Sequence, residues 1–207
     1  MALPNFEVET QLITEGYRAV AGVDEVGRGS LAGPITAAAV ILPRNYKNDE
    51  LNDSKKLSEK KRNELKNIIE KDSIDFAVFS IAPSTIDKIN ILNSTFEAMH
   101  GALCNLKTIP SFIIVDGNKF KKFKNIDYKC IVKGDTKYQN IAAASILAKS
   151  YRDLYMIDQH KRFPVFGWDK NKGYGTKFHL INIEKHGITE LHRKSFSIKR
   201  SQTKLEL

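Results

Sequence analysis

Residues 21–33 read AGVDEVGRGSLAG, and the organisation of the chain can be worked out from there. Two acidic residues, Asp24 and Glu25, end a short apolar run, and a glycine-flanked arginine, Arg28, follows them. A strand here would carry both carboxylates to a sheet edge, while the glycine-rich turn would expose backbone N–H groups. This arrangement suits a divalent cation that meets a nucleic-acid backbone.

The composition is that of one globular domain. The 207 residues are 42% hydrophobic and 28% charged, and the mean hydropathy is −0.35, which is enough for one sizeable core. The longest run without a charge, residues 29–43, is too short to cross a membrane, and residues 1–10 show no targeting signal. We expect a single domain over residues 1–207, a monomer located in the cytoplasm, with no membrane partner.

Cysteine and histidine do not form a metal-binding pattern in the sequence. Cys104 and Cys130 stand alone, so we interpret both as buried or inert thiols. The closest histidine pairs, His179 with His186 and His186 with His192, lack cysteine or carboxylate partners at zinc-site spacing. We expect no zinc site.

Basic residues are in excess, and unevenly so. The chain has 33 Lys and Arg against 24 Asp and Glu, a net charge of +9. Residues 160–200 hold ten of these basic residues against three acidic ones. A basic surface attracts polyanions and makes their binding salt-dependent, although a generally basic proteome would give the same excess.

Short apolar runs and amphipathic segments alternate along the chain. We expect strands over residues 19–24, 35–42, 75–81, 111–116 and 129–133. We expect helices after an N-cap at Ser58, at a capping box of Ser84 and Asp87, from residue 90, over residues 141–160, and from Thr176 to Gly187. This order predicts an α/β fold, with the first two strands as a hairpin and a helical C-terminal part.

Four carboxylates fall at or just beyond the ends of predicted strands: Asp24, Glu25, Asp116 and Asp135. Open α/β sheets place ligand sites there, and converging carboxylates need cations. A pair of divalent ions about 4 Å apart is the usual clamp for phosphodiester hydrolysis. Since consecutive strand side chains point to opposite faces, we predict a break at residues 26–27, or a main-chain carbonyl among the ligands.

The same glycines allow a rival interpretation. Gly27-x-Gly29-x-x-Ala32 after a strand fits the dinucleotide-binding fingerprint, and Asp49 lies at a suitable distance for a ribose contact. A fingerprint loop opens a helix, however, whereas residues 34–36 lead into a predicted strand. Two carboxylates directly before the loop would also repel a pyrophosphate. We therefore favour the metal site.

Seven short blocks along the chain together resemble one family. They are AGVDEVGRG (21–29), NDSKKLS (52–58), VDG (115–117), KGD (133–135), AASILAK (143–149), KGY (172–174) and HR (192–193). In this order they resemble bacterial ribonuclease HII, a type 2 ribonuclease H, over about residues 19–200. The sister type, ribonuclease HIII, usually has a long N-terminal domain and a threonine where this chain has Arg28.

The resemblance implies a ribonuclease H-like fold, a central mixed sheet flanked by helices over about residues 1–158 with a helical C-terminal extension over about residues 159–207. It implies a Mg²⁺- or Mn²⁺-dependent endonuclease that cuts the RNA strand of RNA/DNA hybrids and incises 5′ of single ribonucleotides in duplex DNA, leaving 3′-hydroxyl and 5′-phosphate ends. By motif, Asp24, Glu25, Asp116 and Asp135 would be the catalytic, metal-binding residues.

Two further blocks would contact substrate in that family. The Gly27-Arg28-Gly29 loop would sense the ribose 2′-hydroxyl through its backbone, which glycine permits by close approach. Tyr174 would pack against the sugar that follows the ribonucleotide. Without the resemblance, Tyr174 would be interpreted as a turn tyrosine that packs on the core.

The remaining candidates have simpler alternatives. Lys55 could contact the scissile phosphate or be merely solvated. Ser145 and Lys149, one helical turn apart, could face the substrate backbone or screen the carboxylates. Asp153 could support them from behind, although we do not count it as catalytic.

Two alternatives concern larger units. Trp168, Phe163 and Phe166 could form a base-stacking surface, but a small satellite core is the simpler interpretation. The whole chain could be a basic nucleic-acid-binding module without catalysis, as its charge allows. A passive binder, however, gains nothing from anions placed beside phosphates.

Overall fold

A five-stranded mixed sheet forms the centre of the computed structural model, which describes residues 3–51, 54 and 57–197. The strands are β1 (Val20–Val26), β2 (Ile35–Ile41), β3 (Asp75–Ile81), β4 (Phe112–Asp116) and β5 (Asp127–Ile131), in the order β3-β2-β1-β4-β5. β1, β2 and β3 pair antiparallel, so the predicted hairpin is confirmed, and β4 runs parallel to both β1 and β5.

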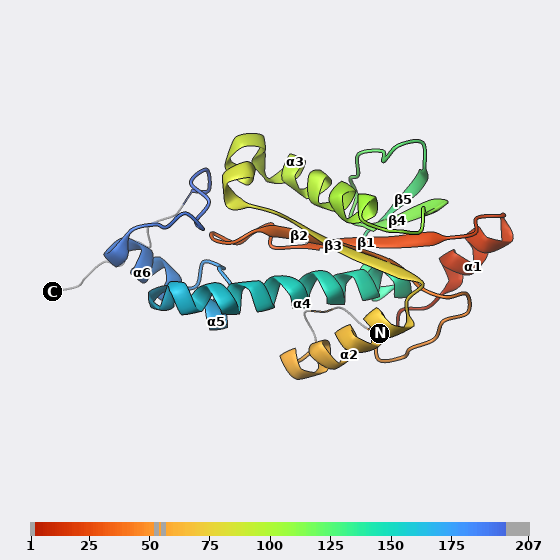
Figure 1. The fold of residues 1–207 in the computed structure, drawn as a ribbon, viewed down its shortest axis with the longest axis horizontal. Coiled ribbons are helices and arrows are strands. Elements are labelled where there is room, and N and C mark those ends of the chain that lie inside the picture. The colour runs from red at the N-terminus through yellow and green to blue at the C-terminus, as the bar shows by residue number, and fades with distance from the viewer. Residues whose placement is uncertain (1–2, 52–53, 55–56, 198–207) are drawn as a thin grey trace.

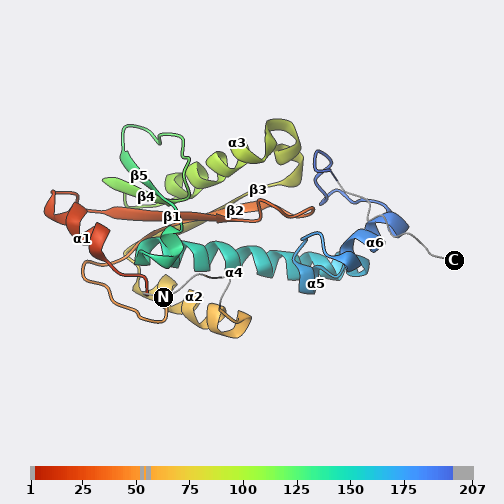
Figure 2. The ribbon, with the colours of Figure 1, turned by 180° about the vertical axis from the view of Figure 1, so that it is seen from behind.

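Helices cover both faces of this sheet. They are α1 (Glu7–Thr14), α2 (Glu59–Asp72), α3 (Pro83–Cys104), α4 (Gln139–Arg162), α5 (Trp168–Asn171) and α6 (Lys177–His186), with short 3₁₀ turns η1 (Gly134–Thr136) and η2 (Pro164–Phe166). In Figure 1 the sheet is seen edge-on, with α3 on one side and α4 and α2 on the other. The view from behind shows the same layers, with α5 and α6 at the end opposite α1 (Figure 2). The expected α/β architecture with a helical C-terminal region is therefore confirmed.

Alternation along the strands divides the core in two. In β2, Ala37 and Ala39 face the α3 layer, whereas Ala38 and Val40 face α4. α4 lies so close to β1 that a Cβ on Gly22 would come 2.2 Å from the Asn140 carbonyl carbon. Small residues thus let the longest helix pack tightly beneath the strand that carries the first two carboxylates.

Most helix ends lie where the sequence predicts them. Ser58 and Thr176 each accept a capping hydrogen bond, and Gly187 ends α6. The capping box of Ser84 and Asp87 is wrong, because α3 begins at Pro83 after Ala82. Asp87 instead accepts hydrogen bonds from residues near the C-terminus. The helix predicted from residue 90 is continuous with α3 except for a break at Asn90, where φ is 66°.

Two strands are shifted from their predicted positions. β1 continues to Val26, two residues further than expected, because Glu25 and Val26 still pair with β2. β5 begins at Asp127 and ends at Ile131. Asp135 therefore lies in η1.

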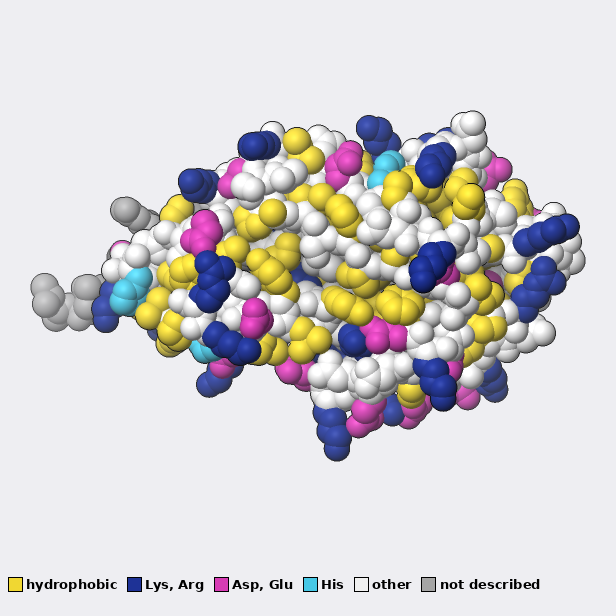
Figure 3. All heavy atoms as spheres, in the orientation of Figure 1, with side chains coloured by type: hydrophobic (Ala, Val, Ile, Leu, Met, Phe, Trp, Pro, Cys, Tyr) yellow, Lys and Arg dark blue, Asp and Glu magenta, His cyan; other side chains and the backbone are white. Residues whose placement is uncertain are grey.

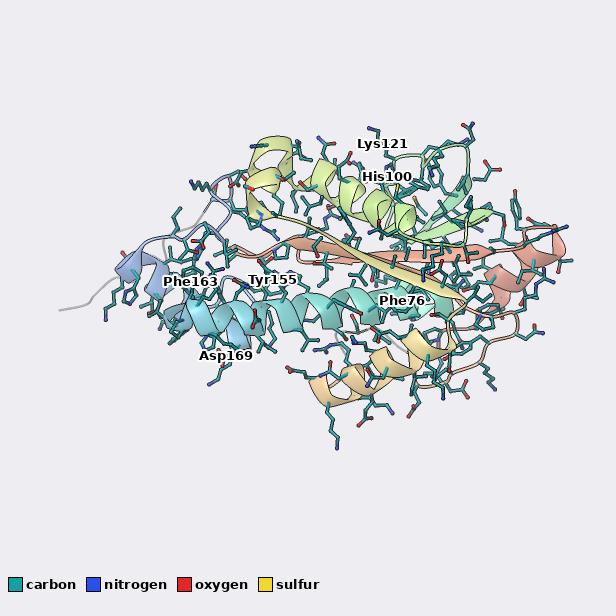
Figure 4. All side chains as sticks on the ribbon, in the orientation of Figure 1. Phe76, His100, Lys121, Tyr155, Phe163 and Asp169 are labelled. Atoms are coloured by element: carbon teal, nitrogen blue, oxygen red, sulfur yellow. The ribbon has the colours of Figure 1, made fainter. Side chains whose placement is uncertain are left out.

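The aromatic group of the C-terminal region is a satellite core. Trp168 and Phe166 are stacked and buried, and Phe163 packs against them. Figure 4 shows Phe163 and Tyr155 at the α4–α6 end of the molecule, far from Phe76 at the other end. The base-stacking interpretation is therefore wrong for the buried rings of Trp168 and Phe166, against which the partly buried Phe163 packs. Within the described part of the chain, no helix combines the length and apolarity needed to cross a membrane.

The surface charge is dispersed. On the face in Figure 3, Lys and Arg side chains are scattered, with Asp and Glu between them. On this face, the net positive charge does not by itself mark a binding surface. The candidate site has to be located from the carboxylates and the loops around them.

Candidate active site

Asp24 and Asp116 end up side by side because β1 and β4 are parallel neighbours. Val23 is in register with Val115, so the next residue of each strand is one of the two aspartates. The Asp116 Oδ1 atom accepts a hydrogen bond from the Gly134 N–H at 2.7 Å. Asp135 follows Gly134 directly and is buried. The carboxyl ends of two strands and the turn after a third thus bring three of the predicted carboxylates to one region.

Asp24 and Glu25 point to opposite sides of β1, as the strand geometry demands. Asp24 is buried toward α4, and its Oδ1 atom accepts a hydrogen bond from the Glu25 N–H at 2.7 Å. Glu25 lies on the α3 side, and its Oε1 atom forms an ion pair with Arg28 Nη1 at 3.4 Å. The strand ends at the predicted position, with Gly27 at a φ of 98°, but Glu25 and Val26 still pair with β2, so this break does not turn the two carboxylates to one face.

A small hollow lies on the α3 side of these carboxylates. Its volume is about 100 Å³. It is lined by Glu25, Arg28, Leu92, Thr95, Phe96, Met99, Asp116, Gly117, Asn118 and Lys119. Glu25 and Asp116 therefore share one solvent-connected space.

The surroundings of these carboxylates disfavour their negative charges. Burial raises the pKa of Asp24 well above its usual value, and the charges of Glu25 and Asp116 raise it further. Burial also raises the pKa of Glu25, while Arg28 opposes the increase. A positive charge placed among these side chains would relieve both burial and mutual repulsion.

The donor set suits a hard divalent cation. Carboxylate oxygens are the ligands that Mg²⁺ and Mn²⁺ prefer. In the described residues, no three His, Cys, Asp or Glu side chains are close enough to form a complete metal cluster by themselves. Mg²⁺ is commonly held by one or two carboxylates together with waters and substrate phosphates. The residues present therefore fit a cation that is completed by substrate.

The Gly27-Arg28-Gly29 loop lies beside the carboxylates and requires its first glycine. A Cβ on Gly27 would come 2.3 Å from Arg152 Nε, and its positive φ is also unfavourable for other residues. No atom of residues 3–51, 54 or 57–197 lies within 4 Å of a Cβ on Gly29, which faces open space. The loop leads into β2, so the dinucleotide-binding interpretation is wrong, because that fingerprint requires a helix here.

Tyr174 belongs to a segment that is hydrogen-bonded to this loop. The Gly173 carbonyl accepts from the Leu31 N–H at 2.8 Å and from the Ala32 N–H at 3.2 Å. Tyr174 itself is half-buried. The glycine-arginine-glycine loop and the tyrosine, far apart in sequence, are thus parts of one structure.

The weaker candidates have mixed outcomes. Ser145 is buried and shares a hydrogen bond of 2.9 Å with Ser54, and its hydroxyl partly offsets the rise that burial causes in the pKa of Asp24. The Lys149 Nζ lies 2.6 Å from Asp153 Oδ2, which also pairs with Arg62 at 3.1 Å. Lys55 lies outside the described residues.

Sequence reasoning missed two buried arginines. Arg152 and Arg193 are 1% and 2% exposed, and both bind carbonyl oxygens of the 28–34 region. Arg193 belongs to the HR block (192–193) of the family resemblance, but the resemblance assigns it no role. Nothing in the sequence around Arg152 distinguishes it from a solvated helix residue.

Histidines do not form a metal site in the described structure. His179 and His192 instead contact each other through their Nε2 atoms at 3.2 Å. Cys104 and Cys130 are free thiols, and Cys104 is exposed rather than buried.

Together, the mixed sheet and the acidic residues at adjacent strand ends define a metal-dependent nuclease of the ribonuclease H class. The family model for ribonuclease HII matches residues 21–199. A ribonuclease HII from Christiangramia forsetii is 56% identical over 187 residues, which covers 90% of this chain and 94% of that protein. This chain belongs to the ribonuclease HII family.

Solved structures have the same fold. The ribonuclease H2 of Pyrococcus horikoshii OT3 matches with a TM-score of 0.74 and 25% identity, covering 87% of this chain and 95% of that one. A Bst ribonuclease HIII in complex with Mn²⁺ matches with a TM-score of 0.64 and 18% identity, covering 87% of this chain and 67% of that one. The ribonuclease H-like fold expected from the sequence is confirmed.

Proposed function

We propose that this ribonuclease hydrolyses the RNA strand of RNA/DNA hybrids and incises 5′ of single ribonucleotides embedded in duplex DNA. The products would carry 3′-hydroxyl and 5′-phosphate ends. The observation that carries the proposal is the register of β1 and β4, which brings Asp24 beside Asp116 next to the glycine-arginine-glycine loop. Membership of the ribonuclease HII family supports the hybrid as substrate.

Four carboxylates would hold the metal: Asp24, Glu25, Asp116 and Asp135. A pair of Mg²⁺ or Mn²⁺ ions, when bound, supplies an activated water and stabilises the leaving oxygen. The protein contributes a fixed frame, because Asp116 is held by the Gly134 N–H and Asp24 by the Glu25 N–H. Burial of Asp24 strengthens its attraction for a cation, since few waters compete there.

Recognition of the ribonucleotide would come from two neighbouring elements. Gly27, Arg28 and Gly29 would approach the sugar with their backbone, and the open space at Gly29 supports this role. The half-buried ring of Tyr174 would pack against the following sugar. A flat ring in contact with a deoxyribose leaves no room for a further hydroxyl, which favours an RNA-to-DNA junction.

Three other side chains are proposed to support substrate binding. Ser145 would act through Asp24, which it contacts. Lys149 is paired with Asp153, so it would have to break this ion pair in order to bind a phosphate. Lys55 would contact the scissile phosphate.

The test is incision of a DNA duplex that contains one ribonucleotide, with Mg²⁺ or with Mn²⁺. We expect a single cut 5′ of the ribonucleotide, no cut without metal, and no cut in the matched all-DNA duplex. The Asp116→Asn variant should lose cleavage yet still bind the hybrid, whereas Asp127→Asn, an exposed aspartate on β5, should keep both. Binding without any cleavage by the wild type would favour the non-catalytic basic module instead.

A further inference from the structure

Two buried guanidinium groups meet the glycine-arginine-glycine loop from inside the protein. Arg152 comes from α4, and Arg193 comes from the segment after α6. Within the described residues neither forms a salt bridge, and each is bound to carbonyl oxygens instead. A buried cation without a carboxylate is costly, and burial lowers the pKa of Arg193 to about 9. Packing alone therefore does not explain why two arginines are buried at this loop.

Arg152 fixes the first peptide of the loop through a serine. Its Nη2 atom donates to the Ser30 Oγ atom at 2.7 Å, and that hydroxyl donates to the Gly27 carbonyl at 2.8 Å. The Gly27 carbonyl is therefore held inward. In a trans peptide the N–H of the next residue points the opposite way, so the Arg28 N–H points outward.

Arg193 fixes the second peptide directly. Its Nη1 atom donates to the Arg28 carbonyl at 3.1 Å, while Nε and Nη2 both donate to the Gly33 carbonyl. By the same geometry the Gly29 N–H points away from the guanidinium. Arg28 and Gly29 are exposed, whereas Gly27 and Ser30 are buried.

Neither outward N–H has a partner among the described residues, since the hydrogen bonds of this loop involve other donors. Two adjacent free amides facing open space form a donor pair for an oxygen. Arg152 also reaches the tyrosine segment, because its Nη1 atom donates to the Lys172 carbonyl at 3.0 Å.

We propose that Arg193 and the Arg152–Ser30 pair are positioning residues that aim the amides of Arg28 and Gly29 at the ribose 2′-hydroxyl. The proposal rests on the proposed function and adds to it the residues that hold the sensing backbone in place. The side chain of Arg28 is not required for this sensing.

The experiment measures binding in EDTA, where no cleavage occurs, to a duplex with one ribonucleotide and to the matched all-DNA duplex. The quantity of interest is the ratio of the two affinities. Partial unfolding lowers both affinities equally and cancels in the ratio, so a merely structural role would not change it. Ser150→Ala is the matched control, since Ser150 is a buried serine of α4 whose hydroxyl has no hydrogen-bond partner among the residues described.

Ser30→Ala should reduce the ratio by about fivefold, which corresponds to loss of one well-aligned hydrogen bond. Arg193→Lys should reduce it similarly, because a lysine keeps the charge but cannot reach the Arg28 and Gly33 carbonyls together. Ser150→Ala should keep the wild-type ratio.

An unchanged ratio in both Ser30→Ala and Arg193→Lys would overturn the inference while leaving the proposed function intact. A wild-type chain that incises the ribonucleotide duplex but binds both duplexes equally would also overturn it. A wild-type chain that neither incises nor discriminates would overturn the proposed function as well.

Discussion

The guanidinium of Arg152 lies over the ring of Tyr174, with its central carbon 5.4 Å from the ring centroid. Arg152 is anchored at the same time to Ser30 and to the carbonyls of Pro34 and Ala32. The position of the ring is therefore set by α4 and by the glycine-arginine-glycine loop together. A cation over an aromatic face adds attraction to this packing.

Tyr174→Ala should lower incision at a single ribonucleotide more than cleavage of a long RNA/DNA hybrid. Only the first substrate requires the ring to read the sugar after the ribonucleotide. We expect kcat/KM to fall about tenfold more on the first substrate, equivalent to about 1.4 kcal/mol of transition-state stabilisation.

Tyr174→Phe should retain most of this selectivity, because the flat ring remains. Tyr128→Ala, which removes another half-exposed tyrosine on β5, is the matched control and should leave the ratio of the two rates unchanged. Equal losses on both substrates in Tyr174→Ala would remove its role as a junction sensor.

Asp24→Asn should stabilise the metal-free protein. Because the folded-state pKa of Asp24 is raised, its charge opposes folding once the pH exceeds its unfolded-state value. Removal of the charge should raise the Tm in EDTA by about 3 °C. The variant should also lose most of the Tm increase that Mg²⁺ gives the wild type.

The control for this prediction is Asp127→Asn, whose carboxylate is exposed and weakly paired with Lys122. It should change neither the Tm in EDTA nor the response to Mg²⁺. A lower Tm for Asp24→Asn in EDTA would show that the carboxylate stabilises the fold rather than serving a cation.

The strands and the carboxylates could be predicted because their signals are local. Apolar runs that end in acidic residues are visible at Asp24 and Asp116, and parallel pairing then brings them together. The sequence pattern places the end of β1 two residues early, since Asp24 and Glu25 look like the end of an apolar run. Pairing with β2 extends the strand regardless of their charge.

The arginine supports could not be predicted, because their signal is entirely tertiary. Arg152 is followed by an acidic residue on a charged helix segment, which is typical of a solvated face. Only the approach of the 27–34 loop to α4 makes it buried. Likewise, Asp87 looked like a helix cap, but its partners come from residues more than 100 positions away.

Glu9→Gln should stabilise the protein above neutral pH. Burial raises the pKa of Glu9 to about 7, and its Oε1 atom accepts from the Asn140 N–H at 3.2 Å. The Oε2 atom and the Asn140 Oδ1 atom are both buried without a hydrogen-bond partner in the part of the chain that the structure describes. The stability that protonated Glu9 provides is present below about pH 4.5 and is lost as the pH rises through 7.

The glutamine variant carries no charge to bury, so we expect it to gain on the order of 2 kcal/mol at pH 8 relative to wild type. The gain should vanish at pH 4.5. Glu7→Gln, which changes an exposed residue of the same helix, should leave the free energy of unfolding unchanged at both pH values. Chemical denaturation at the two pH values is the measurement, and a loss of stability in Glu9→Gln at pH 8 would contradict the prediction.

Acidification should weaken the C-terminal region through two coupled histidines. His179 Nδ1 lies 3.0 Å from the Tyr174 carbonyl, to which it donates, and His179 Nε2 accepts from Trp168 Nε1 at 3.1 Å. His192 Nδ1 accepts from the Thr189 N–H, which places the His192 proton on Nε2, 3.2 Å from His179 Nε2, where it shares the single lone pair of that atom with Trp168. This chain of hydrogen bonds requires both rings to be neutral.

Burial, reinforced by the neighbouring His179, lowers the pKa of His192 to about 4, and burial also lowers that of His179. The stabilisation from neutral rings is thus fully present above about pH 6.5 and is lost as the pH falls toward 4, because the unfolded chain then binds more protons.

The Tm of the wild type should therefore decrease steeply between pH 6.5 and 4.5. His192→Gln should be less stable than wild type at pH 7.5 but show a shallower decrease, whereas the exposed His186→Gln should follow the wild-type curve. Parallel curves for His192→Gln and wild type would mean that the acid sensitivity arises elsewhere in the protein.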